Sequence, residues 1–157
     1  MTERKKVIVT GSATGVGAAS AFALARRGYD VLINYSKSER EAKETERACR
    51  EVGADTLNVR ADVAEDSGCR AIVDAALARW GRLDALVNNA GITTFSGPSN
   101  WDALDAQVFQ RIYAVNLVGA FQMVRAAAPH LKEHGGAIVN MSSIAGTLGT
   151  GSSIPYI

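Results

Sequence analysis

The stretch "KVIVTGSATGVG", Lys6–Gly17, decides the fold of this chain. A β-branched apolar run leads into a loop with glycines at 11, 15 and 17, and a helical pattern, "GAASAFALARRG", follows. Glycine lets a backbone turn tightly and approach a ligand, and a helix N-terminus offers free N–H groups and a positive dipole end. The unit is typical of a pyrophosphate-binding turn, and a glycine-rich turn without a ligand is the alternative.

The spacing of these glycines excludes two better-known loops. A GxGxxG sequence is absent because position 20 is serine, and a P-loop would need Gly-Lys-Ser/Thr. The loop still occupies the first strand-to-helix turn, where alternating strand–helix proteins hold dinucleotides. The cofactor contacts expected from it are Gly11, Ser12, Thr14, Gly15, Val16 and Gly17.

Short apolar runs alternate with helical stretches along the rest of the chain. The runs are continuous rather than alternating, which is typical of parallel strands buried on both faces. The order βαβαβαβαβ predicts an α/β fold with a doubly wound parallel sheet, helices on both faces and strand order 3-2-1-4-5. We expect one domain over residues 1–157, with strands at Lys6–Thr10, Asp30–Tyr35, Asp55–Val59, Asp84–Asn89 and Gly136–Ser142.

Local signals mark the ends of several helices. Gly28, Gly81 and Gly135 each follow a helical stretch and predict a glycine at the helix C-terminus. Ser38 and Glu41 have the spacing of a capping box, which predicts the start of the second helix.

Composition narrows the class of protein. The chain has 157 residues, 47% of them apolar and 21% charged, with a net charge of +1, so it resembles an ordinary globular domain without a basic nucleic-acid footprint. Cys49 and Cys69 have no metal-site spacing and predict reduced thiols rather than a disulfide framework. No segment is long and apolar enough for a signal peptide or a membrane span. We expect a cytoplasmic protein with no metal, nucleic-acid or membrane partner.

The end of the second strand bears on the choice of cofactor. An NAD site usually places a carboxylate there for the ribose hydroxyls, but this strand ends in Asn34, Tyr35, Ser36 and Lys37. We expect the last three of these residues to contact the cofactor. Asp30 begins the strand and therefore lies at the opposite edge of the sheet. Ser36 and Lys37 can hold a phosphate, which favours NADP over NAD, although Lys37 is equally typical of a solvated loop.

Three other stretches carry candidate binding residues. Asp62 and Val63 follow the third strand, where Asp62 can accept a hydrogen bond from adenine or, with Glu65, cap the next turn. In "NNAG", Asn88 and Asn89 can tie backbone segments together, with a plain turn as the alternative, and Ala90 and Gly91 leave room for a ligand. Asn116 lies among apolar residues, as either a satisfied core amide or the mark of a helix distortion at a site.

Together these motifs resemble the short-chain dehydrogenases/reductases over essentially the whole chain. No single motif decides the resemblance, but six occur in order at matching spacing. They are the glycine loop Thr10–Gly17, Asp62-Val63, the "NNAG" sequence, Asn116 in "AVNLVGAF", "GGAIVNMSS" and Tyr156.

The resemblance implies a Rossmann-type domain that binds NADP or NAD, and it implies a set of catalytic residues. Ser143 corresponds to the family's catalytic serine, Tyr156 to its proton-transferring tyrosine, and Asn116 to its asparagine, which would hold a water in a proton path. The family's lysine, four residues after the tyrosine, would stand at position 160, beyond Ile157. A phenol ordinarily titrates near ~10, so a nearby ammonium group is needed to favour its anion at neutral pH.

The resemblance also bears on substrate, assembly and completeness. It implies an oxidoreductase that interconverts a carbonyl and a secondary alcohol, with a 3-oxoacyl thioester as the first candidate substrate and sugar, steroid or cyclic alcohols close behind. The alternative is a dinucleotide-binding module without turnover. Family members continue with further strands and a substrate loop and form homodimers or homotetramers, so we expect the 157 residues to be part of a longer protein, inactive alone, with an open fifth strand.

Overall fold

Five parallel strands form the centre of the computed structural model, which describes residues 4–97 and 100–157. Their order is β3-β2-β1-β4-β5, so the predicted doubly wound sheet is confirmed. Each strand lies within a residue or two of its predicted position because a continuous apolar run has clear limits. The strands are β1 (Lys5–Val9), β2 (Tyr29–Tyr35), β3 (Thr56–Arg60), β4 (Ala85–Asn88) and β5 (Ala137–Asn140).

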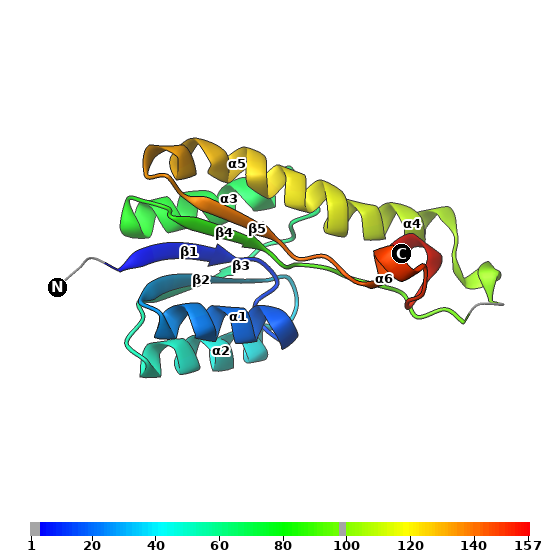
Figure 1. Ribbon diagram of the computed structural model, residues 1–157, viewed down its shortest axis with the longest axis horizontal. Coiled ribbons are helices and arrows are strands. Elements are labelled where there is room, and N and C mark those ends of the chain that lie inside the picture. Colours follow the sequence, from blue (N-terminus) through cyan, green and yellow to red (C-terminus); the bar gives the residue numbers. More distant parts are fainter. Residues whose placement is uncertain (1–3, 98–99) are drawn as a thin grey trace.

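Helices cover both faces of the sheet (Figure 1). One layer holds α1 (Gly15–Arg26) and α2 (Glu39–Glu51), and the other holds α3 (Asp66–Trp80) and α5 (Ala120–Glu133). The second layer continues past the carboxyl ends of the strands. There lie α4 (Ala106–Tyr113), a π-helical segment (Ala114–Gly119), the short α6 (Ala145–Leu148) and single 3₁₀ turns at Trp101–Ala103 and Ile154–Tyr156.

Side chains of the central strands alternate between two cores. Ile8 and Leu32 are fully buried against α3 and α5, whereas their neighbours Val7 and Val31 are fully buried on the side of α1 and α2. Burying an aliphatic side chain of this size contributes about 1.5–3 kcal/mol relative to its exposure. Both alternating sets must therefore be apolar, which explains why the strands read as unbroken apolar runs.

Glycines end three helices as predicted. Gly28, Gly81 and Gly135 have φ angles of 88°, 70° and 64°, in the left-handed region that glycine enters without strain. The predicted capping box is wrong. Ser38 does occupy the N-cap of α2, but its backbone is not extended (φ −87°, ψ 64°) and its hydroxyl makes no capping hydrogen bond, while Glu41 pairs with Arg40.

The fifth strand lies at the edge of the sheet and is open to solvent, as the sequence predicted. All four residues of β5 are exposed, including Ile138 and Val139, which are 38% and 50% exposed. The apolar side chains of the other strands are largely buried, so this edge differs in character from the rest of the sheet.

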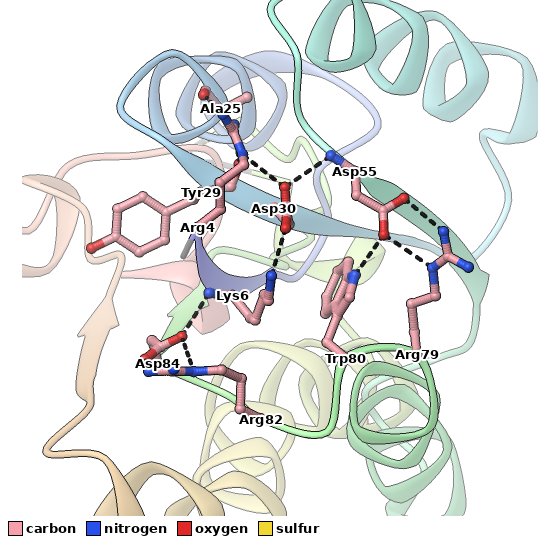
Figure 2. Close-up of polar contacts among 10 residues, drawn as sticks. All are labelled: Arg4, Lys6, Ala25, Tyr29, Asp30, Asp55, Arg79, Trp80, Arg82 and Asp84. Carbon is pink, nitrogen blue, oxygen red and sulfur yellow. Dashed lines mark hydrogen bonds and ion pairs between the residues drawn. The ribbon is translucent and has the colours of Figure 1, made fainter. Parts of the chain in front are cut away.

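Ionic groups join the amino ends of the strands, opposite the glycine loop (Figure 2). The Asp30 carboxylate accepts hydrogen bonds from Lys6 Nζ at 2.7 Å, from Arg4 Nε at 2.8 Å and from the backbone N–H of Asp55 at 2.9 Å. It thereby links β1, β2 and the start of β3. Asp84 accepts the Lys6 backbone N–H at 2.7 Å, which adds the chain entering β4 to the same network.

We predict that Asp30→Asn lowers the free energy of unfolding by about 3 kcal/mol, because the substitution leaves the buried ammonium of Lys6 without its counter-charge. Urea denaturation followed by circular dichroism measures the loss. Asp74→Asn, on the exposed surface of α3, is the matched control and should change stability by less than about 0.5 kcal/mol. Equal losses in the two variants would contradict the role of the Asp30 network.

Candidate functional site

The glycine loop and the loop after β4 are joined at the carboxyl edge of the sheet. The Thr10 hydroxyl accepts the backbone N–H groups of Asn89 and Ala90, each at 3.0 Å. The Asn89 carboxamide donates in return to the carbonyl oxygens of Thr10 and Gly11, at 2.9 and 3.1 Å. Asn88 donates to the side chain of Asn140 at 2.9 Å, so the tie between backbone segments predicted for "NNAG" is confirmed.

Two glycines are required where these loops meet. A Cβ on Gly11 would lie 2.7 Å from the Cα of Ala90, and the φ angle of Gly11 is 61°. A Cβ on Gly17 would collide with the Asn89 carboxamide and lie 2.5 Å from the Gly11 carbonyl oxygen. The loop is therefore closed to side chains by its own packing, and only glycine permits the approach.

A cleft of about 340 Å³ opens along this edge. It runs from the start of α1 across the ends of β1, β2 and β4 to α4. Most of the cofactor-binding residues predicted from the sequence line it. They are Gly11, Thr14, Val16, Gly17, Ser36, Asp62, Val63, Asn89, Ala90 and Gly91.

Four predicted residues do not line the cleft. The Ser12 hydroxyl is fully buried, donating to the Val9 carbonyl at 2.6 Å and accepting the Asn34 N–H at 3.1 Å, so it joins β1 to β2 instead. Tyr35 packs on the core beside α2. Gly15 and Lys37 are exposed beyond the cleft wall.

Five residues that line the cleft were not predicted as cofactor contacts, and two of them, Asn34 and Arg111, have polar side chains. Asn34 donates to the carbonyl oxygens of Val59 and Ala61, at 3.2 and 3.0 Å, and accepts the Gly11 N–H at 3.2 Å. The feature of the sequence that could have indicated this role is that Asn34 is a single amide at the end of an apolar strand. The second residue is Arg111 of α4, and nothing in its local sequence distinguishes it from a surface arginine.

Arg111 closes the far end of the cleft by an ion pair. Its guanidinium lies 2.6 Å from Asp62 Oδ2, while Asp62 Oδ1 accepts the Ala64 N–H at 3.0 Å. The structure thus shows Asp62 capping the turn that follows it. Burial raises the pKa of Asp62, but these two hydrogen bonds and the charges of Arg111 and Lys37 outweigh it, so the pKa lies below its ordinary value.

A second cavity, about 330 Å³, adjoins the cleft and brings the predicted catalytic residues together. Asn116, Ser143 and Tyr156 all line it. It shares Val16 and the loop 89–91 with the first cleft. A ligand that extended along the cleft past Val16 would therefore reach the hydroxyl groups of Ser143 and Tyr156.

Asn116 lies in a π-helical segment, so the predicted helix distortion is confirmed. Its carboxamide forms two hydrogen bonds with the backbone of Ile92, accepting the N–H at 2.8 Å and donating to the C=O at 2.9 Å. The amide therefore has hydrogen-bond partners for both its oxygen and its nitrogen, and it holds the loop after β4. The two alternatives considered from the sequence, a hydrogen-bonded core amide and a helix distortion, both apply to Asn116.

Ser143 and Tyr156 are held by the short segments around them. The Ser143 hydroxyl accepts the Ala145 N–H at 3.2 Å at the start of α6. Tyr156 ends a 3₁₀ turn, and its backbone N–H donates to Ser153 at 3.1 Å. Ser153 is buried and anchors this turn, and Tyr156 lines the cavity.

Other kinds of site lack support in the parts of the chain that the structure describes. No group of three or more His, Cys, Asp or Glu side chains in residues 4–97 and 100–157 is placed to hold a metal. Over the same residues, no helix has the length and apolar character that crossing a bilayer demands. Cys49 and Cys69 are buried, and burial raises the pKa of each thiol to about 11, which makes both poor nucleophiles.

Comparison with known proteins shows the family to which the chain belongs. The model of the short chain dehydrogenase family matches residues 5–157. A protein of Streptomyces violaceoruber assigned as ketoacyl reductase 2 of the granaticin polyketide synthase is 43% identical over 98% of this chain and 61% of its own length. The 3-oxoacyl-[acyl-carrier-protein] reductase FabG of Staphylococcus aureus is 32% identical over 100% of this chain and 63% of its own.

A solved structure from Burkholderia xenovorans, assigned to the short-chain dehydrogenases/reductases, is similar with a TM-score of 0.94 and 43% identity. The match covers 99% of this chain and 66% of that one. The chain spans less than two thirds of the curated relatives quoted above. The family model matches nearly the whole chain, and the chain belongs to the short-chain dehydrogenase family.

Proposed function

We propose that this chain is the dinucleotide-binding and catalytic part of an NADP-dependent oxidoreductase that interconverts a carbonyl and a secondary alcohol. The observation that carries the proposal is the continuity of the two cavities. The cleft along the glycine loop leads through Val16 and loop 89–91 to Ser143 and Tyr156. Family membership supports the oxidoreductase class, in which bound nicotinamide supplies or accepts hydride.

The residues of the second cavity fit the proton side of this chemistry. Tyr156 presents a hydroxyl that can donate a proton to a carbonyl oxygen or accept one from an alcohol. The Ser143 hydroxyl lines the same cavity and can donate a hydrogen bond to that oxygen as negative charge develops on it. Asn116 holds the loop that forms one wall, through its two bonds to Ile92.

The end of β2 supports NADP as the preferred cofactor. Asp30, the carboxylate of this strand, lies at the opposite edge of the sheet in the Lys6 ion pair. Ser36 lines the cleft, Lys37 follows it, and Arg60 Nε donates to the Ser36 carbonyl at 3.3 Å. Two cations and a hydroxyl favour a phosphate on the adenosine ribose, where a carboxylate would repel it.

A 3-oxoacyl thioester is the substrate class that we favour, with a ketoacyl reductase and FabG among the relatives in support. A sugar is the second candidate, because L-rhamnose 1-dehydrogenase (NAD(P)(+)) of a Sphingomonas species is 37% identical over 95% of this chain and 58% of its own length. A dinucleotide-binding module without turnover is the alternative from another class.

We predict that Gly17→Ala weakens NADP binding at least tenfold, because the new Cβ displaces Asn89 and opens the junction between the two loops. Isothermal titration calorimetry of the 157-residue chain measures the dissociation constant. Gly97→Ala is the matched control, since a Cβ there meets no atom within 4 Å, and its affinity should equal that of the wild type. Unchanged binding by Gly17→Ala would exclude this loop as the nucleotide site.

For cofactor choice, we expect Lys37→Asp to reduce affinity for NADP about tenfold or more while affinity for NAD holds or rises, because a carboxylate repels the phosphate and suits free ribose hydroxyls. Separate titrations of the two nucleotides give the ratio. The exposed lysine of α2, tested as Lys43→Asp, is the control for a general change of charge. If NADP affinity were untouched in Lys37→Asp, the assignment of Lys37 would fail.

Turnover tests the catalytic proposal. In the full reading frame that encodes this chain, NADPH oxidation with acetoacetyl thioesters and a carbonyl panel should fall by about 10²–10⁴-fold in Tyr156→Phe, because the proton donor is lost. NADPH affinity should remain within about threefold of the wild type. If the unmodified protein binds NADPH but reduces no carbonyl, the binding-module alternative is correct.

A further inference from the structure

A third cavity, about 450 Å³, adjoins the catalytic pair. Ser143 and Tyr156 line it together with Asn89 and Gly91, so it is continuous with the cavity described above. The loop after β4 forms another part of its wall, through Thr93 and Phe95. A carbonyl held at the two hydroxyls has room for a substituent on this side.

The chemistry of this wall differs from that of the nucleotide cleft. The cleft carries the opposite charges of Asp62 and Arg111. Among the described residues that line the third cavity, none is charged, and its polar groups are hydroxyls, one side-chain amide and the backbone. A substituent with a carboxylate or phosphate would lose water here without gaining a counter-charge, which disfavours charged substrates.

Phe95 contributes an exposed apolar ring to the wall of this cavity. Its side chain is 87% exposed, the highest value among the large apolar side chains that the structure describes. In the part of the chain that the structure describes, a benzyl side chain this exposed forgoes the free energy of burial. A ligand that covered the ring would recover it.

The segment that carries Phe95 is fixed to the segment that carries Tyr156. The Ser96 N–H donates to the Ser152 carbonyl at 2.9 Å, and the Thr93 hydroxyl is hydrogen-bonded to the Ser152 hydroxyl. Ser152 directly precedes the buried Ser153 that anchors the turn of Tyr156. The ring and the proposed proton donor are therefore held in one frame, as positioning of a substrate requires.

We propose that Phe95 is a specificity-determining residue, and that the site selects uncharged ketones whose apolar substituent packs against its ring. The assignment rests on the proposed function for the reaction itself. The binding preference rests only on the third cavity, and it can be measured without turnover.

The test is ¹⁹F NMR with 4′-fluoroacetophenone as the probe and NADP⁺ present, so that no reduction occurs. The probe signal should broaden and shift with the wild type, and Phe95→Ala should raise the dissociation constant about tenfold, as expected for loss of an aromatic contact. Phe95→Tyr should keep the affinity within about threefold, because the ring remains. Phe121→Ala removes another exposed aromatic, from α5 outside the cavity, and should change nothing.

Charge selection is tested with a matched pair of probes, 4-fluorophenylglyoxylate and its methyl ester. The ester should bind at least about tenfold more tightly than the anion, since the cavity offers no counter-charge. Equal binding of acid and ester, or unchanged affinity for the ketone in Phe95→Ala, would overturn the proposal. Because Phe95 is exposed, its alanine variant should retain the urea midpoint of the wild type, which separates lost contact from lost folding.

Kinetics then separates this inference from the proposed function. In the full reading frame, Phe95→Ala should lower the ratio of kcat/KM for acetophenone to that for butanone about tenfold, whereas Tyr156→Phe should lower both values equally. Probe binding at Phe95 without reduction of any ketone would refute the proposed function and still support the assignment of Phe95. A ratio that Phe95→Ala leaves unchanged would refute the assignment of Phe95 alone.

Discussion

The buried hydroxyl of Thr10 is the joint on which the site depends. It accepts the N–H groups of Asn89 and Ala90 and so fixes the glycine loop of β1 against the loop of β4, 79 residues further along the chain. A hydroxyl oxygen has two lone pairs and can accept both N–H groups at once. Glycine is required at positions 11 and 17 because the two joined loops lie too close together for any side chain there.

The amino and carboxyl ends of the strands differ in the groups that they carry. At the amino edge, Asp30 and Lys6 form a buried ion pair that neighbouring backbone groups complete, and neither residue lines any of the three cavities described above. At the carboxyl edge, the interior bonds are made by amides and hydroxyls such as Asn34, Asn89 and Asn116. These neutral groups hold the loops, and the two charged side chains that line the cleft, Asp62 and Arg111, pair with each other.

Much of this arrangement could be predicted from the sequence, because its causes are local. Continuous apolar strands and left-handed glycines such as Gly81 indicate the elements, and the order of elements indicates which loops meet. The features that could not be predicted depend on residues that are distant in the sequence or on the local backbone angles. The direction of the Ser12 hydroxyl is set by Asn34, the importance of Arg111 by Asp62, and the failed capping box by the backbone angle at Ser38.

The central claim, that a dinucleotide binds along the carboxyl edge of β1 and β4, is tested most directly by ¹H–¹⁵N NMR of the chain during titration with NADP⁺. The amide signals of Gly11, Gly17 and Ala90 should shift together and saturate at one equivalent. Those of Lys6 and Asp30, at the opposite edge, should stay in place. Shifts confined to the amino edge, or saturation with no change at the glycine loop, would contradict the account.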